Sequence, residues 1–249
     1  MALVLPPGLT ASARTLRDTA RRRGMRTVQL PDREVPEGLR TGGAYLHAGP
    51  SFADAVAPAL DIAPLEAPAD WLARLPAAFV RREIRAVPIG EAYGLRRPAF
   101  VKSPNDKSIP ALVYADGSRL PGPDAVDTGT TVLVSDVLAF DAEYRLYLLD
   151  GQVHTGSRYA TRGKLHLAPL SAGARAFGSE LLAACGHTLP SAIVVDVGLT
   201  DAGQWAVVEA NAAWASGCYS SDPDRALDVV LRAAGPAAHL AERDGPFVR

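Results

Sequence analysis

One stretch near the C-terminal end, AIVVDVGLTDAGQWAVVEAN at 192–211, constrains the fold most strongly. It holds two apolar runs around the turn residues 201–204, which is typical of a buried antiparallel hairpin. Asp196 lies in the first run, and Glu209 and Asn211 lie in the second. Polar side chains on a buried strand are costly unless they have partners. The hairpin therefore has to bury polar side chains, and the groups that these side chains contact indicate their function.

A four-residue loop at 201–204 would pair Thr200 with Trp205 and place Asp196 directly across from Glu209. Asn211 then lies on the same face. Two carboxylates in that position repel each other and favour a cation between them. Oxygen ligands without histidine or cysteine suit Mg²⁺ or Mn²⁺ and not zinc. The alternative is that each carboxylate pairs separately with an arginine while Asn211 caps the strand end.

Lysine usage indicates a second feature. Of 26 basic residues only three are lysines, and Lys102 and Lys107 both fall in VKSPNDK. Two ammonium groups at a strand end suit an anion such as a polyphosphate. Two solvated lysines beside a turn are the simpler reading when this stretch is taken alone.

Arginines in a further hairpin complete the set of candidates. EYRLYLLDGQVHTGSRYA turns at Asp150–Gly151, with Glu143, Arg145 and Tyr147 on one face of its first strand. Arg145 and Arg158 could each clamp a phosphate or a carboxylate. Pairing with Glu143 or Asp141 is an equally good account of either arginine.

The rest of the chain predicts alternating strands and helices. Helices are expected over Ser12–Arg23, Ser51–Leu60, Ser171–Cys185 and Asp222–Ala234. Strands are expected at ALVLPP, RTVQL, AYLHAG, FVRREIRAVPIGEA, PAFVKS, IPALVYADG and GTTVLVSDVLAF. The Pro-rich run Pro58–Pro76 reads as a connector with one short helix. The fold class is α/β (α+β), and strand–helix–strand alternation in the first third favours a parallel sheet.

Composition and charge exclude some classes of function. The formal net charge is −1 over 249 residues, which does not favour nucleic acid or an anionic membrane as a partner. The N-terminal apolar stretch is too short for a signal peptide or a membrane span, so a cytoplasmic protein is expected. Cys185 and Cys218 have no metal-ligand spacing and read as buried thiols. A homodimer is one open option for the oligomeric state.

Taken in order, FVKSPNDK, EYRLYLLDGQV and VEANAAW resemble the ATP-grasp superfamily, in particular the clade with one characteristic Arg and two Lys. The resemblance covers roughly Phe79 to Ala234. It implies an ATP-grasp fold with a pre-ATP-grasp domain at 1–77 and two subdomains at 78–138 and 139–249. No Gly-rich loop is visible over the phosphates; SPNDKS stands in its place.

The resemblance also implies roles for individual residues. Lys102 and Lys107 would contact the ATP phosphates, and Glu143 the ribose. Asp196, Glu209 and Asn211 would hold Mg²⁺ or Mn²⁺, and Arg145 and Arg158 would steady phosphates or an acyl phosphate. The backbone of the interdomain hinge, made of Ser135, Asp136, Val137 and Leu138, would hold the adenine edge.

The function implied is an ATP-dependent carboxylate–amine or carboxylate–thiol ligase. Its partners would be ATP together with a small-molecule or peptide carboxylate and an amine. Two alternatives stay open: a nucleotide-binding module that acts through a partner protein, and a kinase-like phosphotransferase with the same metal site. The loop after Asn211, with Trp214, Ser216, Cys218 and Tyr219, either lines the substrate pocket or packs beneath the last helix.

Overall fold

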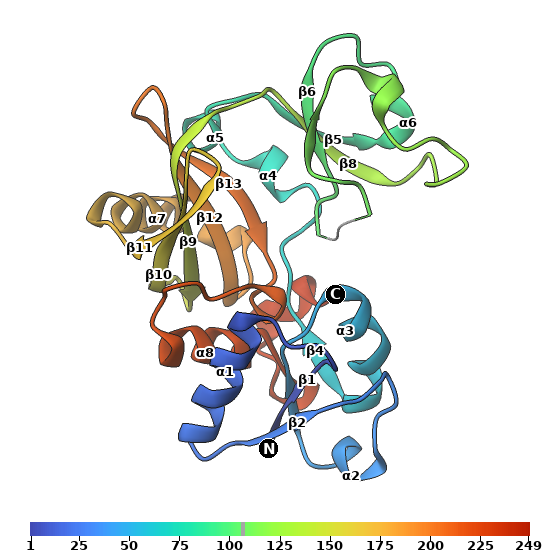
Figure 1. Cartoon of the computed structure of the whole chain (residues 1–249), viewed down its shortest axis with the longest axis vertical. Helices are drawn as coiled ribbons and strands as arrows, with labels where there is room; N and C mark the ends of the chain where they lie inside the picture. Colours follow the sequence, from blue (N-terminus) through green and yellow to red (C-terminus); the bar gives the residue numbers. More distant parts are fainter. Residues whose placement is uncertain (106–107) are drawn as a thin grey trace.

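The computed structural model describes residues 1–105 and 108–249. Its N-terminal unit is a parallel sheet in the order β2–β1–β3, formed by Ala2–Leu5 (β1), Arg26–Gln29 (β2) and Ala44–Leu46 (β3). Three helices accompany it: Ala11–Arg22 (α1), Glu37–Arg40 (α2) and Pro50–Val56 (α3). This unit lies at the lower end of Figure 1. The expected parallel sheet is confirmed.

The connector contains more structure than its composition predicts. It holds Pro58–Leu60 (η1), Ile62–Pro64 (β4), Trp71–Arg74 (α4) and Ala77–Val80 (α5). Strand β4 pairs with Ala234–Pro236 (β14), so the connector is tied to the C-terminal segment. The helix expected over Ser51–Leu60 is split into α3 and η1, because Pro58 removes a backbone donor inside it.

A second, antiparallel sheet has the order β5–β8–β6–β7. Its strands are Ile84–Pro88 (β5), Ala99–Lys102 (β6), Leu112–Tyr114 (β7) and Thr131–Ser135 (β8), with Ile89–Ala92 (α6) and Gly117–Arg119 (η2) between them. Three expected strands here are shorter than predicted. The run 109–117 forms a strand only at β7. The run 79–92 is a strand only at β5, and the long strand at 129–140 stops at Ser135 and resumes at Phe140 after the hinge.

The largest sheet is antiparallel, in the order β11–β10–β9–β12–β13. Its strands are Phe140–Leu149 (β9), Gln152–Thr161 (β10), Lys164–Pro169 (β11), Ala192–Thr200 (β12) and Trp205–Asn211 (β13). Both predicted hairpins are confirmed, whereas β11 was not predicted. Its side chains are mostly exposed, so it lacks the alternating burial that marks a strand in sequence.

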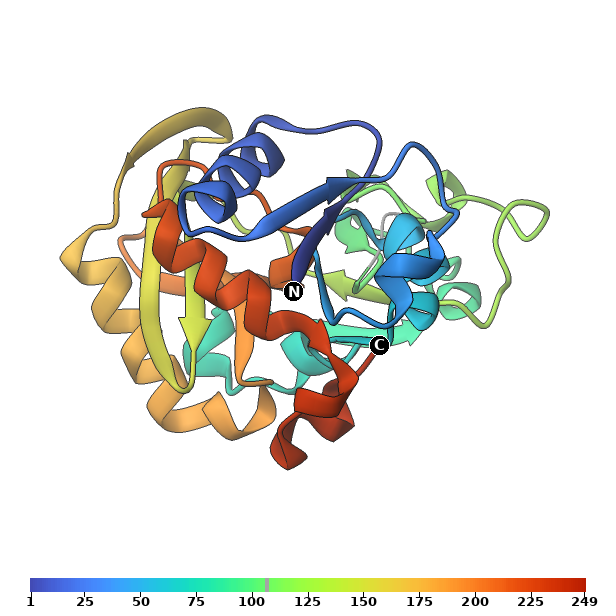
Figure 2. The ribbon, with the colours of Figure 1, turned by 90° about the horizontal axis from the view of Figure 1, so that it is seen from below.

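Helices cover this sheet on both faces. Ala172–Cys185 (α7), capped by Ser171, packs on the face that carries Leu146 and Val195. Pro223–Ala233 (α8), capped by Asp222, packs on the other face beside α1 (Figure 1, Figure 2). The short turns Gly186–Thr188 (η3), Ala213–Ala215 (η4), Ala237–His239 (η5) and Glu242–Phe247 (η6) complete the chain.

The hydrophobic core explains why the N-terminal unit sits where it does. One cluster joins Leu3 and Leu46 of the parallel sheet to Val230 of α8 and to Tyr147 and Val194 of the large sheet. Because this core runs across the expected boundary at 77/78, the unit is packed onto the last third of the chain. The boundaries 1–77, 78–138 and 139–249 stay predictions. No helix in the described part of the chain is long and apolar enough to cross a membrane.

Candidate active site

The register of the β12–β13 hairpin places Asp196 directly across from Glu209, as expected, but by a different route. The turn pairs Leu199 with Trp205, one residue off the predicted register. The pairing then shifts by one residue between Val197 and Asp196, and this β-bulge restores the expected pair. A bulge inserts one extra residue and re-aims the neighbouring side chains.

The three predicted oxygen ligands converge. The Asn211 amide nitrogen donates to Glu209 Oε1 at 2.9 Å and to Asp196 Oδ2 at 3.3 Å. Asp196 is 1% exposed, so its carboxylate is held almost entirely by protein groups. The hairpin thus places two carboxylates and one amide in a single patch on one face of the large sheet.

Two cations meet this patch. Arg145 lies beside Asp196 on the neighbouring strand β9, and its Nε and Nη2 donate to the two Asp196 oxygens at 2.9 and 2.7 Å. Lys102, at the end of β6 on the smaller sheet, pairs with Glu209 Oε2. The alternative, in which each carboxylate pairs separately with an arginine, is therefore confirmed for Asp196 only, because Glu209 forms its ion pair with a lysine.

For each of the two carboxyl groups, burial raises the pKa and a neighbouring positive charge lowers it. Burial raises the pKa of Asp196, with Arg145 opposing it. Burial also acts to raise the pKa of Glu209, but Lys102 and the Asn211 amide outweigh it and leave that pKa below its usual value. Glu209 is therefore an ionised carboxylate whose charge depends on a neighbouring cation.

Two aromatic rings pack against the Arg145 guanidinium. Its guanidinium lies 5.1 Å from the Tyr219 ring centroid and 5.7 Å from that of Tyr159, and the two rings stack at 5.2 Å. The Tyr159 hydroxyl donates to Glu143 Oε2 at 2.8 Å. Burial raises the pKa of Glu143 in spite of that hydrogen bond. Glu143 and Arg145 therefore share one face, as predicted.

Tyr159 was missed by sequence reasoning. It follows Arg158 at a bulge in β10, where the pairing shifts between Arg158 and Ala160, and no local pattern marks that shift. Tyr219 was left open between pocket and packing. Ser216 and Tyr219 line a cavity, whereas Trp214 and Cys218 are buried in the core beneath α8.

The four residues expected to form the hinge lie at the connection between the two antiparallel sheets. Ser135 is the last residue of β8, and its hydroxyl donates a hydrogen bond to the Asp136 backbone carbonyl oxygen at 3.0 Å. Asp136 is tied to the start of β5, accepting from the Glu83 amide at 3.2 Å, and Val137 is exposed. Leu138 is half-buried.

Arg158 makes no hydrogen bond to the patch among the described residues. The hydrogen bond of the Arg158 guanidinium goes to His166 Nε2 at 3.5 Å, and its buried Nε has no partner among the described residues. Lys107 lies outside the described residues. His154 also lies apart from the patch in its contacts, since its Nε2 is hydrogen-bonded to Asp228 Oδ2 at 3.1 Å.

The patch fits a hard divalent cation by the chemistry of its donors. Within 1–105 and 108–249, no group of three or more His, Cys, Asp or Glu side chains could hold a metal. The proposed set has two carboxylates and takes its third oxygen from the Asn211 amide. Turning that amide about its last bond would bring its oxygen toward the carboxylates. The donor set suits Mg²⁺, which needs few protein ligands.

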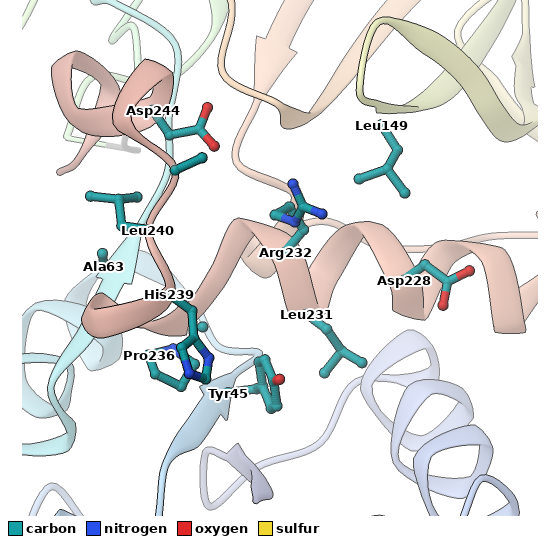
Figure 3. Close-up of a pocket in the computed structure, with 12 residues that line it drawn as sticks. Tyr45, Ala63, Leu149, Asp228, Leu231, Arg232, Pro236, His239, Leu240 and Asp244 are labelled. Atoms are coloured by element: carbon teal, nitrogen blue, oxygen red, sulfur yellow. The ribbon is translucent and has the colours of Figure 1, made fainter.

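A cavity of about 740 Å³ opens beside the patch. Lys102, Glu209 and Asn211 line one side of it, and the loops that follow β1 and β3 line another. A second hollow, of about 290 Å³, lies between α8, β14 and the C-terminal turns (Figure 3). Its charged groups already have other partners, since Arg232 pairs with Asp150 and Asp244 accepts from Ser191. The larger cavity is the better candidate for a substrate.

Comparison with known proteins gives a consistent picture. The family model that matches residues 79–229 describes an ATP-grasp domain, family 2 of the clade named for one arginine and two lysines. No curated protein matches the sequence significantly.

Among solved structures, the chain is similar to D-cycloserine synthetase DcsG, at 16% identity and a TM-score of 0.60, covering 92% of this chain and 98% of that one. It is also similar to the ATP-grasp ligase PsnB bound to a minimal precursor, at 13% identity and a TM-score of 0.54, covering 92% and 98%. A RimK domain ATP-grasp protein from Sphaerobacter thermophilus DSM 20745 matches at 16% identity and a TM-score of 0.50, covering 92% and 96%. These likenesses concern the fold.

Proposed function

The chain belongs to family 2 of the ATP-grasp clade named for one arginine and two lysines, and on that premise we propose that it is an ATP- and Mg²⁺-dependent ligase joining a carboxylate to an amine. The observation that carries the proposal is the convergence of Asp196, Glu209 and Asn211 with Lys102 beside a large cavity. A solved PsnB complex, similar at a TM-score of 0.53, contains Mg and ADP. Burying several carboxylates together costs free energy, and a protein that only bound a nucleotide and catalysed no reaction would have no need of them.

The proposed reaction has two steps. A substrate carboxylate oxygen attacks the terminal phosphorus of ATP, ADP leaves, and an acyl phosphate forms. The amine nitrogen then attacks the acyl carbon, the C–O bond to phosphate breaks, and the amine gives up a proton. Catalysis of such steps is mostly positioning and neutralisation of charge.

The residues divide this work as follows. Asp196, Glu209 and Asn211 would hold Mg²⁺, which when bound neutralises charge on the phosphate oxygens. Lys102 would move from Glu209 to a phosphate once the metal takes its place. Arg145, fixed by Asp196 and the two tyrosine rings, would contact the transferring phosphoryl group.

The nucleotide would lie between the two antiparallel sheets. The backbone of the hinge, at Ser135, Asp136, Val137 and Leu138, would hold the adenine edge, and Glu143 the ribose. Arg158 and Lys107 remain proposed phosphate contacts. The buried Nε of Arg158, which has no partner among the described residues, leaves a donor for one.

The direct test is to measure ADP release and product mass with a panel of carboxylates and amines. Glu209→Gln should lose at least about a hundredfold in kcat, in the range seen when one electrostatic contact to a transition state is removed. Glu180→Gln, an exposed change on α7, is the matched control.

Each outcome has a distinct meaning. ADP together with an amide supports the ligase. ADP with a phosphorylated product that no amine consumes indicates a phosphotransferase. Equal rates in Glu209→Gln and the native chain would refute the assigned site.

A further inference from the structure

Glu66 places a carboxylate on the wall of the large cavity. It follows β4 in the connector, and its backbone amide donates to the Phe247 carbonyl at 3.0 Å, next to a bridge between Leu65 and Val248. The side chain is 19% exposed and lines the cavity. Because the backbone on both sides of this position is tied to the C-terminal segment, the fold itself determines where the acidic group lies.

The carboxylate of Glu66 is only partly neutralised. Its Oε2 accepts from Arg249 Nη1 at 2.6 Å, but the same guanidinium also bonds both oxygens of Asp54 on α3, at 2.6 and 3.2 Å. One cation between two carboxylates leaves one negative charge in excess. Glu66 Oε1 accepts no hydrogen bond within residues 1–105 and 108–249, although a carboxylate oxygen has two lone pairs. The group therefore keeps an acceptor and a negative charge for a ligand.

The other ionisable groups on the described part of the cavity wall do not offset this charge. Lys102 is the one lysine or arginine among the described lining residues, and it pairs with Glu209. His47 is neutral at pH 7, because burial lowers its pKa to about 4. The excess negative charge on the wall thus comes from Glu66 and its partners. A cavity wall with this charge attracts a cation.

Hydrogen bonds on either side of Glu66 place it near the patch. The Leu65 carbonyl accepts from Trp214 Nε1 at 2.8 Å, in the loop that follows β13. The Ala67 carbonyl accepts from Asn105 Nδ2 at 2.9 Å, just after β6. Residues from the connector, from this loop and from the patch line one small hollow together, namely Ala67, Asn105, Lys102 and Glu209. A cation bound at Glu66 would therefore lie beside the patch.

We propose that Glu66 binds the amine substrate and that this substrate enters the cavity as an ammonium ion. An alkylammonium group has three N–H donors and one positive charge, and Glu66 Oε1 accepts one of these hydrogen bonds. The ammonium ion gives up one proton to water before its nitrogen attacks the acyl carbon. Glu66 thus holds the amine and forms no covalent bond to it. The role as amine substrate rests on the proposed ligase function, whereas binding of an ammonium ion at Glu66 does not.

The first test uses the full native chain without ATP and asks whether the charge of the ligand is recognised. Ligand-observed NMR titration at pH 7 compares α-amino amides, from alaninamide upward in size and in both enantiomers, with α-hydroxy amides of the same skeleton. The hydroxy amides keep the shape and lose the positive charge. At least one amino amide should bind, and its hydroxy counterpart should bind about tenfold or more weakly, because a charge-assisted hydrogen bond is lost.

Two substitutions with different expected effects separate ligand binding from a structural role. Glu66→Gln keeps the shape, removes the charge and should weaken binding of the amino amide about tenfold. Arg249→Met removes the cation that competes for Glu66, so the same amide should bind at least as tightly as to the native chain. If Glu66 only held Arg249 in place, both substitutions would weaken binding. Glu180→Gln, exposed on α7, is the control.

Kinetics test the same residue during turnover. With an amine that the ligase consumes, Glu66→Gln should raise the KM for the amine about tenfold, because binding common to the ground and transition states is lost. The KM for ATP should not rise with it. A general disturbance of the fold would raise both constants. The comparison of amino amides with hydroxy amides on the native chain depends on no variant, so it still decides if Glu66→Gln fails to fold.

Four results would overturn the proposal: no amino amide binds, hydroxy amides bind as tightly as amino amides, Glu66→Gln binds like the native chain, or Arg249→Met weakens binding as much as Glu66→Gln does. Failure of the ligase proposal looks different. Amino amides that bind through Glu66 while no substrate pair releases ADP would leave this site standing and remove the ligase. Ligation with an unchanged amine KM in Glu66→Gln would leave the ligase standing and remove this site.

Discussion

Arg145 and Asp196 form a two-point ion pair between adjacent strands in the interior of the large sheet, at 2.9 and 2.7 Å. The side chains are 11% and 1% exposed. Asp196 raises the pKa of Arg145 against the opposing effect of burial, so the guanidinium stays charged. The pair fixes the direction of both side chains, and this rigidity suits a group that has to meet a phosphate at a defined place.

Breaking this pair should destabilise the fold strongly. Arg145→Met leaves Asp196 buried without its cation, and we expect a loss of about 3–5 kcal/mol in the free energy of unfolding. The exposed pair Arg162–Asp141 of the same sheet is the control, and Arg162→Met should cost under about 1 kcal/mol. Urea denaturation measures both. A loss for Arg145→Met no larger than that of the control would contradict the view that the pair is structurally essential.

Lys102 and Mg²⁺ should compete for Glu209. Because the ammonium occupies the position proposed for the metal, Lys102→Met should tighten Mg²⁺ binding in the absence of nucleotide. The same change should weaken ATP binding, since a phosphate contact is lost. Calorimetric titration of Mg²⁺ alone and of ATP alone measures the two effects. Lys164→Met, on the edge strand β11, should change neither, and an unaltered Mg²⁺ affinity in Lys102→Met would count against the shared site.

His47 should make stability depend on pH. Burial lowers the pKa of His47 to about 4, from an ordinary value of 6.5. Between these values the unfolded chain binds a proton at His47 and the folded chain does not, so stability falls as pH is lowered. From about pH 7 to about pH 5 the loss is of order 2 kcal/mol. His47→Leu should lack this part of the pH dependence, measured by urea denaturation at both pH values; a slope identical to that of the native chain would disprove it.

Gly178 should tolerate no larger side chain although it lies in a helix. A Cβ there would come within 2.6 Å of Leu146 Cδ1 and 2.9 Å of Val153 Cγ2. Alanine adds about 1 kcal/mol of helix propensity, but overpacking costs typically about 1–3 kcal/mol. We expect Gly178→Ala to lower the thermal midpoint, and Ser179→Ala, at an exposed position of α7, to leave it unchanged or raise it. A higher midpoint for Gly178→Ala would show that α7 can move away from the sheet.

The sequence by itself determined the strongly patterned parts. Strand patterns on either side of turn residues predicted the hairpins β9–β10 and β12–β13, and the helices expected from Ser171 and Asp222 begin within one residue of those positions in α7 and α8. These signals are local, since a strand's period and a helix's cap depend on neighbours in the chain. Counting along one hairpin also gave the pairing of Asp196 with Glu209, but the count was one residue off at the turn and the pair was reached only through a bulge that the count did not include.

The tertiary structure decided what depends on distant partners. The bulge that brings Asp196 back opposite Glu209 has no signature in composition, and the pairing of Lys102 with Glu209 joins residues on two different sheets. Tyr159 and Tyr219 meet over Arg145 from two separate segments. His47 looked like an ordinary residue after a strand until packing buried its Nδ1 beside the cavity. Local periodicity gives a side chain its face, and only packing between segments gives it its partner.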